Sequence, residues 1–290
     1  MPHILRNKNI ELHLDDPLER YQSARFDWTG KITKVAFHDC DFAGFESLDD
    51  DSLGQGFYNE FGIDTALGFD QAMPGFWFHK IGVGLLRKDH EPYSFAKAYE
   101  IRPAGFQVSA SKERLTLVCR SEAVLGYAYV LEKDIALHDD GFSITYQLHN
   151  VGDKEIVTDE YVHNFLAINQ ALLGEEYMLR LPFPTKPEAF GETVNPEGKA
   201  LVDTNEIRFA GTPSEPFFFS NLSGGEPVAT SWELIHSKQG IGIRESVDFS
   251  CSKANLWGCG HVISPELFCP VHVLVGATRK WSRRYELFRT

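Results

Sequence analysis

The stretch IALHDDGFSITYQLHN, residues 135–150, decides the fold class of this 290-residue chain. Apolar and polar residues alternate on both sides of the turn-forming sequence His138 to Gly141, and from Phe142 to Leu148 the period of two is strict. Because successive side chains of a β-strand point to opposite faces, this pattern predicts a hairpin with one buried and one wet face.

Short segments of similar strand-like character occur along the rest of the chain. They are Lys31 to His38, Leu115 to Arg120, Tyr127 to Lys133, Ile156 to Ile168, Glu226 to Ile235, Gly240 to Val247 and Pro270 to Ala277. Helix-start signals are scarce, and the clearest is Asp16 to Glu19, where a helical turn is expected to run to Tyr21. We therefore predict an all-β fold, a large antiparallel β-sandwich with few short helices, as a single domain over residues 1–290.

Two long segments interrupt the strand pattern. Residues Asp39 to Phe78 are rich in Gly, Asp and Phe, and Leu181 to Thr212 is rich in proline. Loops of this length in a compact domain are usually functional or disordered. Their aromatic residues favour the first possibility, so we expect both segments to be ordered walls around a cleft.

The charge balance argues against a nucleic-acid partner. The chain has 28 Lys and Arg against 41 Asp and Glu, a formal net charge of −13, and nucleic-acid affinity comes largely from cations that neutralise phosphates. The one basic cluster, Arg279, Lys280, Arg283 and Arg284, is expected to be a solvated strand face rather than a phosphate site.

Nothing in the sequence indicates export or membrane insertion. Residues Met1 to Tyr21 lack the apolar centre of a signal peptide, and no run approaches the roughly 18 apolar residues of a membrane span. The five cysteines are scattered and include no C-x-x-C pair, so we expect buried, reduced thiols and no metal site. These features predict a cytoplasmic protein with no membrane partner.

Two segments carry candidate catalytic residues. In YVHNFLAIN, which starts at Tyr161, a period of two places His163 on one face with Tyr161 and Phe165. In ISPELFCP, the carboxylate of Glu266 stands in an apolar stretch between two prolines, which favour an extended or turning backbone. A structural histidine and a solvent-exposed strand-end glutamate are the alternative interpretations, and the pattern alone does not decide between them.

Four segments, in this order, resemble the aldose 1-epimerase (galactose mutarotase-like) family. RFDWTGKI (Arg25 to Ile32) is similar to the family's first-strand segment, and FHKIGVGLL (Phe78 to Leu86) is similar to its glycine-bearing segment. Tyr161 to Asn169 is similar to the segment that carries the general acid. Ser264 to Glu266, followed by Pro270 and a strand ending near Tyr285, is similar to the segment that carries the general base. The family's paired Gly-Arg and Asn-Arg motif is absent from the first long segment, and Arg87 is only a loose substitute.

The resemblance implies a β-supersandwich whose concave face holds one monosaccharide, with His163 as general acid and Glu266 as general base. An anionic cleft is expected to favour the imidazolium form of His163. Acid and base together suffice to open and reclose a sugar ring, so we expect an isomerase that interconverts the anomers of a free aldose with no cofactor and no metal.

Further residues are candidates for binding the sugar. As substrate-binding residues we expect Arg25, His79, Lys80 and Asn164, with Trp28, Trp77 and Trp257 as possible stacking partners and Glu60 and Asp64 as additional polar groups. The alternative for Arg25 is a structural charge pair with Asp27 on one strand face, and for His79 and Lys80 a solvated edge.

Three other functions remain open. A phosphosugar (hexose-6-phosphate) 1-epimerase of the same fold would need a cationic pocket. A non-catalytic carbohydrate-binding protein would keep the cleft without turnover. A two-carboxylate glycosidase would need an acidic partner for Glu266, for which Asp159 and Glu160 are the nearest candidates. The sequence identifies neither the sugar nor the oligomeric state.

Overall fold

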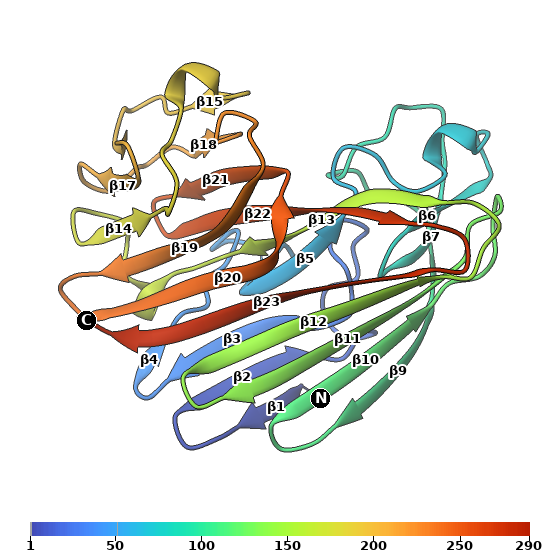
Figure 1. Ribbon diagram of the computed structural model, residues 1–290, viewed down its shortest axis with the longest axis horizontal. Helices are drawn as coiled ribbons and strands as arrows, with labels where there is room; N and C mark the ends of the chain where they lie inside the picture. Colours follow the sequence, from blue (N-terminus) through green and yellow to red (C-terminus); the bar gives the residue numbers. More distant parts are fainter. Residues whose placement is uncertain (1, 51) are drawn as a thin grey trace.

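The computed structural model describes residues 2–50 and 52–290, whose strands form two large sheets and one small sheet (Figure 1). The first large sheet has ten strands in the order β1-β2-β3-β5-β13-β22-β21-β18-β15, with β4 beside β3. Its strands are β1 (His3–Arg6), β2 (Ile10–Asp15), β3 (Lys31–Phe37), β4 (Cys40–Asp41), β5 (Phe57–Phe61), β13 (Ile156–Asn164), β22 (Val262–Val273), β21 (Lys253–Cys259), β18 (Phe217–Phe219) and β15 (Thr193–Val194).

The second large sheet also has ten strands and contains the hairpin predicted over residues 135–150. Its strands, in spatial order, are β16 (Ala200–Val202), β17 (Glu206–Phe209), β14 (Tyr177–Arg180), β19 (Val228–His236), β20 (Ile241–Cys251), β23 (Thr278–Arg289), β12 (Gly141–Asn150), β11 (Tyr129–His138), β10 (Arg114–Arg120) and β9 (Gly105–Ala110). The small sheet comprises β6 (Trp77–Lys80), β7 (Gly84–Arg87) and β8 (Ile101–Pro103). Three short 3₁₀-helices complete the regular structure: Phe69–Gln71, Ile168–Gln170 and Pro187–Ala189.

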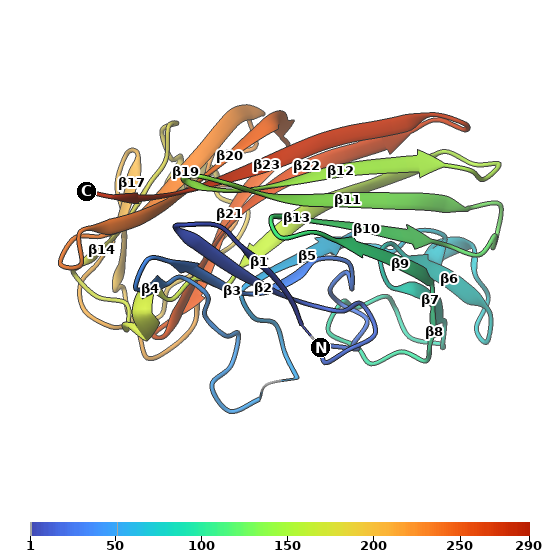
Figure 2. The same cartoon turned by 90° about the horizontal axis from the view of Figure 1, so that it is seen from below.

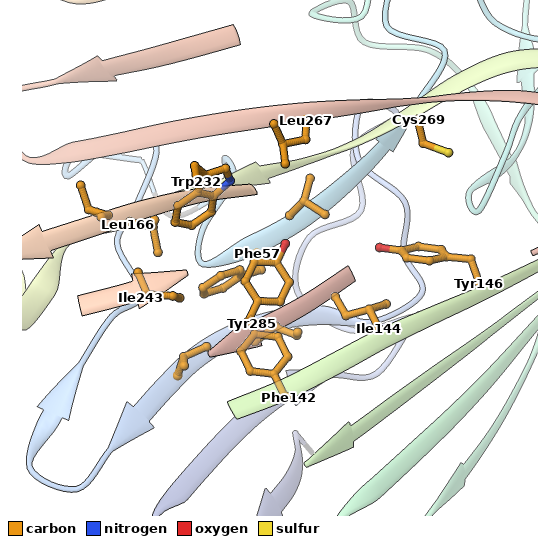
Figure 3. Packing of buried hydrophobic residues seen from close by; sticks show 14 of the residues in the cluster. Phe57, Phe142, Ile144, Tyr146, Leu166, Trp232, Ile243, Leu267, Cys269 and Tyr285 are labelled. Atoms are coloured by element: carbon orange, nitrogen blue, oxygen red, sulfur yellow. The ribbon is translucent and has the colours of Figure 1, made fainter. Parts of the chain in front are cut away.

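The two large sheets pack face to face, as Figure 2 shows. The predicted hairpin is confirmed, because β11 and β12 pair antiparallel from Tyr129 opposite Asn150 to His138 opposite Gly141. Its inward side chains meet those of the facing sheet in one aromatic-rich core, where the ring of Phe57 on β5 meets Phe142 edge-on at 5.6 Å (Figure 3). An antiparallel β-sandwich with few short helices is therefore the observed fold.

The first long segment is not only a wall, and the predicted helical turn is absent. Strand β5 lies within residues 39–78, and all five of its residues are buried. Between Asp16 and Tyr21 the structure has turns instead of a helix. The ammonium of buried Lys31 donates to the carbonyl oxygens of Pro17 (3.4 Å), Glu19 (2.5 Å) and Tyr21 (3.1 Å), so these carbonyls are turned toward a side chain rather than along a helix axis.

Two predicted strands have different ends. The strand predicted to continue to Ile168 ends at Asn164, a single bridge follows at Leu166, and Asn169 then adopts a positive φ of 50°. The predicted strand Pro270 to Ala277 is the end of β22, which stops at Val273, followed by a turn into β23. Glu266 therefore lies inside a long extended strand and not at a strand end.

The basic cluster near the end of the chain is not a uniformly solvated face. Alternation along β23 turns Arg283 into the sandwich, where it is fully buried between Glu160 and Glu245, with nitrogen–oxygen distances of 2.7 Å to each. Arg284 points outward to Asp140. The prediction of a solvated strand face is thus wrong for Arg283, because the alternation carries one of the four cations to the inner side.

All five cysteines are free thiols, of which Cys40 and Cys259 are half-buried. The small sheet lies at one end of the sandwich, and strands β14 to β18 of the two large sheets lie at the other (Figure 1). Within residues 2–50 and 52–290, no helix has the length and apolar character needed to cross a membrane.

Candidate active site

A cleft of about 580 Å³ opens over β13, β22 and β21. Its floor is formed by Tyr161 and His163 of β13, Glu266 of β22 and Trp257 of β21. Asn164, the neighbour of His163, points the opposite way and accepts a hydrogen bond from Tyr285 of the second sheet. The cleft therefore lies on the outer face of the first sheet, away from the sandwich core.

The two long segments supply walls of this cleft, as predicted. Glu46 and Asp64 come from the first segment and Glu192 comes from the second. Phe95, which precedes β8, and Phe218 of β18 add aromatic surface. The cleft is thus bordered from both ends of the sandwich by parts of the chain that are far apart in sequence.

His163 and Glu266 are directly opposite each other on neighbouring strands. The register of β13 and β22 on either side of them aligns the two residues. Nε2 of His163 lies 3.2 Å from Oε1 of Glu266, and both side chains are buried. Ser264 donates a longer hydrogen bond of 3.4 Å to the same carboxylate oxygen. Two titratable groups at the cleft floor are therefore in direct contact.

Aromatic rings surround the imidazole. The predicted shared face of Tyr161, His163 and Phe165 is confirmed, and the ring of Phe165 stacks on His163 at 4.0 Å. Trp257 and Phe26 meet the imidazole edge-on at 5.3 Å and 6.1 Å. This apolar surrounding holds the ring in one orientation and removes most of its water.

Burial decides the protonation of the pair. It raises the pKa of Glu266 to about 8, although the positive charge of Arg25 acts in the opposite direction. Burial and, to a smaller extent, Arg25 hold the pKa of His163 well below its usual 6.5. The expectation that the cleft favours imidazolium is therefore wrong: near neutral pH the pair holds one proton, and that proton resides on Glu266.

Arg25 is the charged residue with the strongest influence on the pKa values of this pair, and two carboxylates hold its guanidinium in place. Its Nη1 lies 2.7 Å from Oε1 of Glu46, and its Nε lies 3.2 Å from Oε2 of Glu60. The guanidinium also lies over the rings of Phe26 and Phe95. The alternative pairing with Asp27 does not occur, because Asp27 is bonded to the ammonium of Lys133 on the far side of the sheet.

The fold has known relatives among solved structures, although the chain matches no protein-family model and no curated protein. It superposes over 100% of its length on 99% of a putative aldose 1-epimerase from Escherichia coli, with a TM-score of 0.65 and 11% identity. A galactose mutarotase-like protein from Lactobacillus casei covers 99% of this chain with 100% of its own (TM-score 0.64, 13% identity). The superposition on an aldose epimerase homologue from Caenorhabditis elegans covers the full length of both chains, with a TM-score of 0.57 and 11% identity. The chain has the galactose mutarotase-like fold.

Three predicted binding residues lie outside the cleft of this galactose mutarotase-like fold. Lys80 is buried behind it and donates to Oε1 of Glu60 at 3.0 Å and to the hydroxyl of Tyr93 at 2.9 Å. His79 is buried against Tyr127 and Tyr129. Asn164 faces the sandwich interior, because it is one residue out of phase with His163. Of the predicted substrate-binding residues, Arg25 alone is among those that line the cleft in the described part of the chain.

The secondary candidates divide in the same way. Trp257 and Asp64 line the cleft, whereas Trp28 stacks on Phe106 in a core cluster and Trp77 contacts Arg102 on the small sheet. Glu60 is fully buried and accepts hydrogen bonds from Tyr161, Arg25 and Lys80. It supports two cleft residues from behind.

Several residues that line the cleft were not predicted from the sequence. They are Glu46, Ile63, Phe95, Glu192, Phe218, Ser220, Lys253 and Asn255. The signal for Glu46 and Glu192 was their place in the two long segments, but nothing in the neighbouring sequence distinguishes them from the other carboxylates of these segments. Among the residues described here, no cluster of three or more His, Cys, Asp or Glu side chains is arranged to hold a metal ion.

Proposed function

We propose that the protein is an aldose 1-epimerase that interconverts the α and β anomers of a free sugar, with Glu266 as general base and His163 as general acid. The observation that supports this most is the buried His163–Glu266 contact of 3.2 Å on the floor of an open cleft. A pair that shares one proton near neutral pH contains one acid and one base, which is what anomer interconversion requires.

The chemistry follows from the position of that proton. A sugar hydroxyl that donates to Glu266 stabilises its ionised form, and the proton passes to Nε2 of His163 across their contact. Glu266 then removes the proton of the C1 hydroxyl, the bond between C1 and the ring oxygen breaks, and His163 protonates the ring oxygen. After rotation about the C1–C2 bond of the open-chain aldehyde, the same transfers run in reverse. The pair ends with the one proton it began with.

The charges of the cleft favour a neutral sugar over a phosphorylated one. Besides Glu266, which is protonated near neutral pH, the carboxylates of Glu46, Asp64 and Glu192 line it, against the cations Arg25 and Lys253. Arg25 is paired with two carboxylates, and Nζ of Lys253 lies 3.6 Å from Asp64. A phosphate group placed here would meet more negative than positive charge.

Polarimetry tests the proposed function directly. We expect the protein to accelerate the approach of a freshly dissolved pure anomer of a free aldohexose to equilibrium, and to act more weakly on the corresponding hexose 6-phosphate. Rates equal to the buffer control for a panel of free aldoses would refute the proposal. Binding of a sugar in the same samples without acceleration would identify a carbohydrate-binding protein, and faster turnover of the phosphorylated sugar a phosphosugar epimerase.

The pH dependence of the reaction is a second expected result. Above about pH 8 Glu266 loses its proton, so the pair no longer contains an acid. Toward acid pH the pair keeps its single proton until His163 takes up a second one, well below pH 6.5. Measured between pH 5 and 10, kcat/KM should therefore be level around neutrality and fall above about pH 8. A level profile up to pH 10 would contradict this assignment of the proton.

A further inference from the structure

The pairing of β13 with β22 is interrupted at the candidate pair. The regular ladder ends where Glu160 lies opposite Cys269, and an isolated bridge between Leu166 and Ile263 follows. Between these two points lie His163, opposite Glu266, and Asn164. The separation of the two strands at this place sets how far apart the imidazole and the carboxylate are.

A proline removes one backbone donor from this stretch, and Asn164 compensates for it. Pro265 precedes Glu266 and has no N–H to donate. Its carbonyl oxygen accepts a hydrogen bond of 2.7 Å from Nδ2 of Asn164. A residue in an antiparallel strand directs its N–H and its C=O toward the same neighbour, so the missing donor of Pro265 also falls on the side of β13. A side chain thus replaces part of the backbone pairing beside the pair.

Asn164 is itself held in place from the sandwich interior. It is fully buried, and its Oδ1 accepts a hydrogen bond of 3.0 Å from the hydroxyl of Tyr285. The same amide nitrogen has weaker contacts with the carbonyl of Val162 at 3.3 Å and with Glu245 at 3.4 Å. Asn164 therefore connects three strands, β13, β22 and β23. It adjoins His163 in the sequence, and its partner Pro265 adjoins Glu266.

We propose that Asn164 is a positioning residue, which joins β13 to β22 so that His163 and Glu266 remain in hydrogen-bond contact. It does not touch the substrate, because its side chain lies on the face of the sheet opposite the cleft. This replaces its predicted role in sugar binding, and its effect on catalysis rests on the proposed function. Without this link the strands separate locally, water enters between the pair, and the shared proton is held less strongly.

The charged groups around the pair keep their ion-pair partners when Asn164 is changed. On the cleft side Arg25, Glu60 and Lys253 act on Glu266, and Arg25 also acts on His163. On the interior side Glu245 loses its 3.4 Å contact with the Asn164 amide but stays paired with Arg283. A shift in the titration of the pair therefore reports its geometry rather than a new charge.

The test compares Asn164→Leu with Asn59→Leu. Asn59 is also a buried asparagine in the first sheet, on β5, and bonds to Tyr146, Glu160 and Lys133 without contacting β22. For Asn164→Leu we expect kcat to fall about 10- to 100-fold with little change in KM, because a small misplacement of catalytic groups is costly. The alkaline limb of the pH profile should move to lower pH, as the carboxyl of Glu266 becomes hydrated. Asn59→Leu should lower stability but leave this limb in place.

A second measurement does not depend on turnover. The ¹⁵N resonances of the His163 ring, assigned with His163→Gln, report its hydrogen bond to Glu266, and Asn164→Leu should shift them while Asn59→Leu should not. Should Asn164→Leu fail to fold, Asn164→Ser is expected to give the same shifts in smaller size. Unchanged ring resonances and an unchanged pH limb in the Asn164 variant would overturn the proposal. If the native protein turns over no sugar, the proposed function fails, and the ring resonances still decide the role of Asn164.

Discussion

Replacing Glu266 by glutamine is expected to slow anomer interconversion by about 10²–10⁴-fold, the usual contribution of a positioned acid or base. Glutamine keeps the shape of the side chain and fits the same place opposite His163, but it can neither accept the proton of the C1 hydroxyl nor share one with the imidazole. Sugar binding should be largely retained. Polarimetry for the rate and titration with the same sugar for affinity separate the two effects.

The chain offers a matched control for this experiment. On the surface, Nε2 of His272 lies 2.9 Å from Oε2 of Glu155, and both side chains are more than half exposed. Glu155→Gln removes a carboxylate from an equivalent contact in water, far from the cleft floor, and should leave the rate unchanged. A Glu266→Gln protein that is folded and as fast as the Glu155→Gln control would show that Glu266 is not the base.

The second large effect is expected on stability. Arg283→Leu should lower the free energy of unfolding by about 3–5 kcal/mol, the usual cost of breaking a buried ion pair. The guanidinium lies between Glu160 and Glu245, and also donates to the carbonyl of Leu267 at 2.9 Å. Its removal leaves two carboxylates in the core without their counter-charge. Urea unfolding followed by tryptophan fluorescence measures the change.

The neighbouring arginine provides the comparison. Arg284 has the same side chain and an ion pair with Asp140, but both partners are partly exposed, and such pairs contribute about 0–1 kcal/mol. Arg284→Leu should therefore shift the unfolding midpoint only slightly. Equal losses in the two variants would show that the interior network around Arg283 does not stabilise the sandwich more than a surface pair does.

Local alternation was enough to predict the sandwich and part of the site. It located the hairpin of β11 and β12 and the common face of Tyr161, His163 and Phe165. It did not locate β5, whose sequence FYNEF has no alternation because both faces of this strand are covered. A strand buried on both sides has no polar face to show a period of two.

Polar residues were harder to place than apolar ones. His79 and Lys80 have the chemistry of sugar ligands, but Lys80 is used to hold Glu60, a partner that no local pattern reveals. Asn164 was assigned to the cleft although it alternates with His163. Neighbouring residues of a strand point to opposite faces, so a His163 that faces the cleft requires Asn164 to face the interior. The strand period alone was therefore enough to avoid this error.

The strands that carry the site come together across long separations in the chain. The hydroxyl of Tyr161 and the carboxylate of Glu60 are 101 residues apart in sequence, and so are the amide of Asn164 and the carbonyl of Pro265. Closing loops of this size costs entropy before their contacts form, so such pairings are slow. During synthesis β13 leaves the ribosome about a hundred residues before β22, and until then its edge is an unpaired template for other chains. The arrival of β22 therefore both completes the floor of the cleft and covers an open sheet edge of the nascent protein.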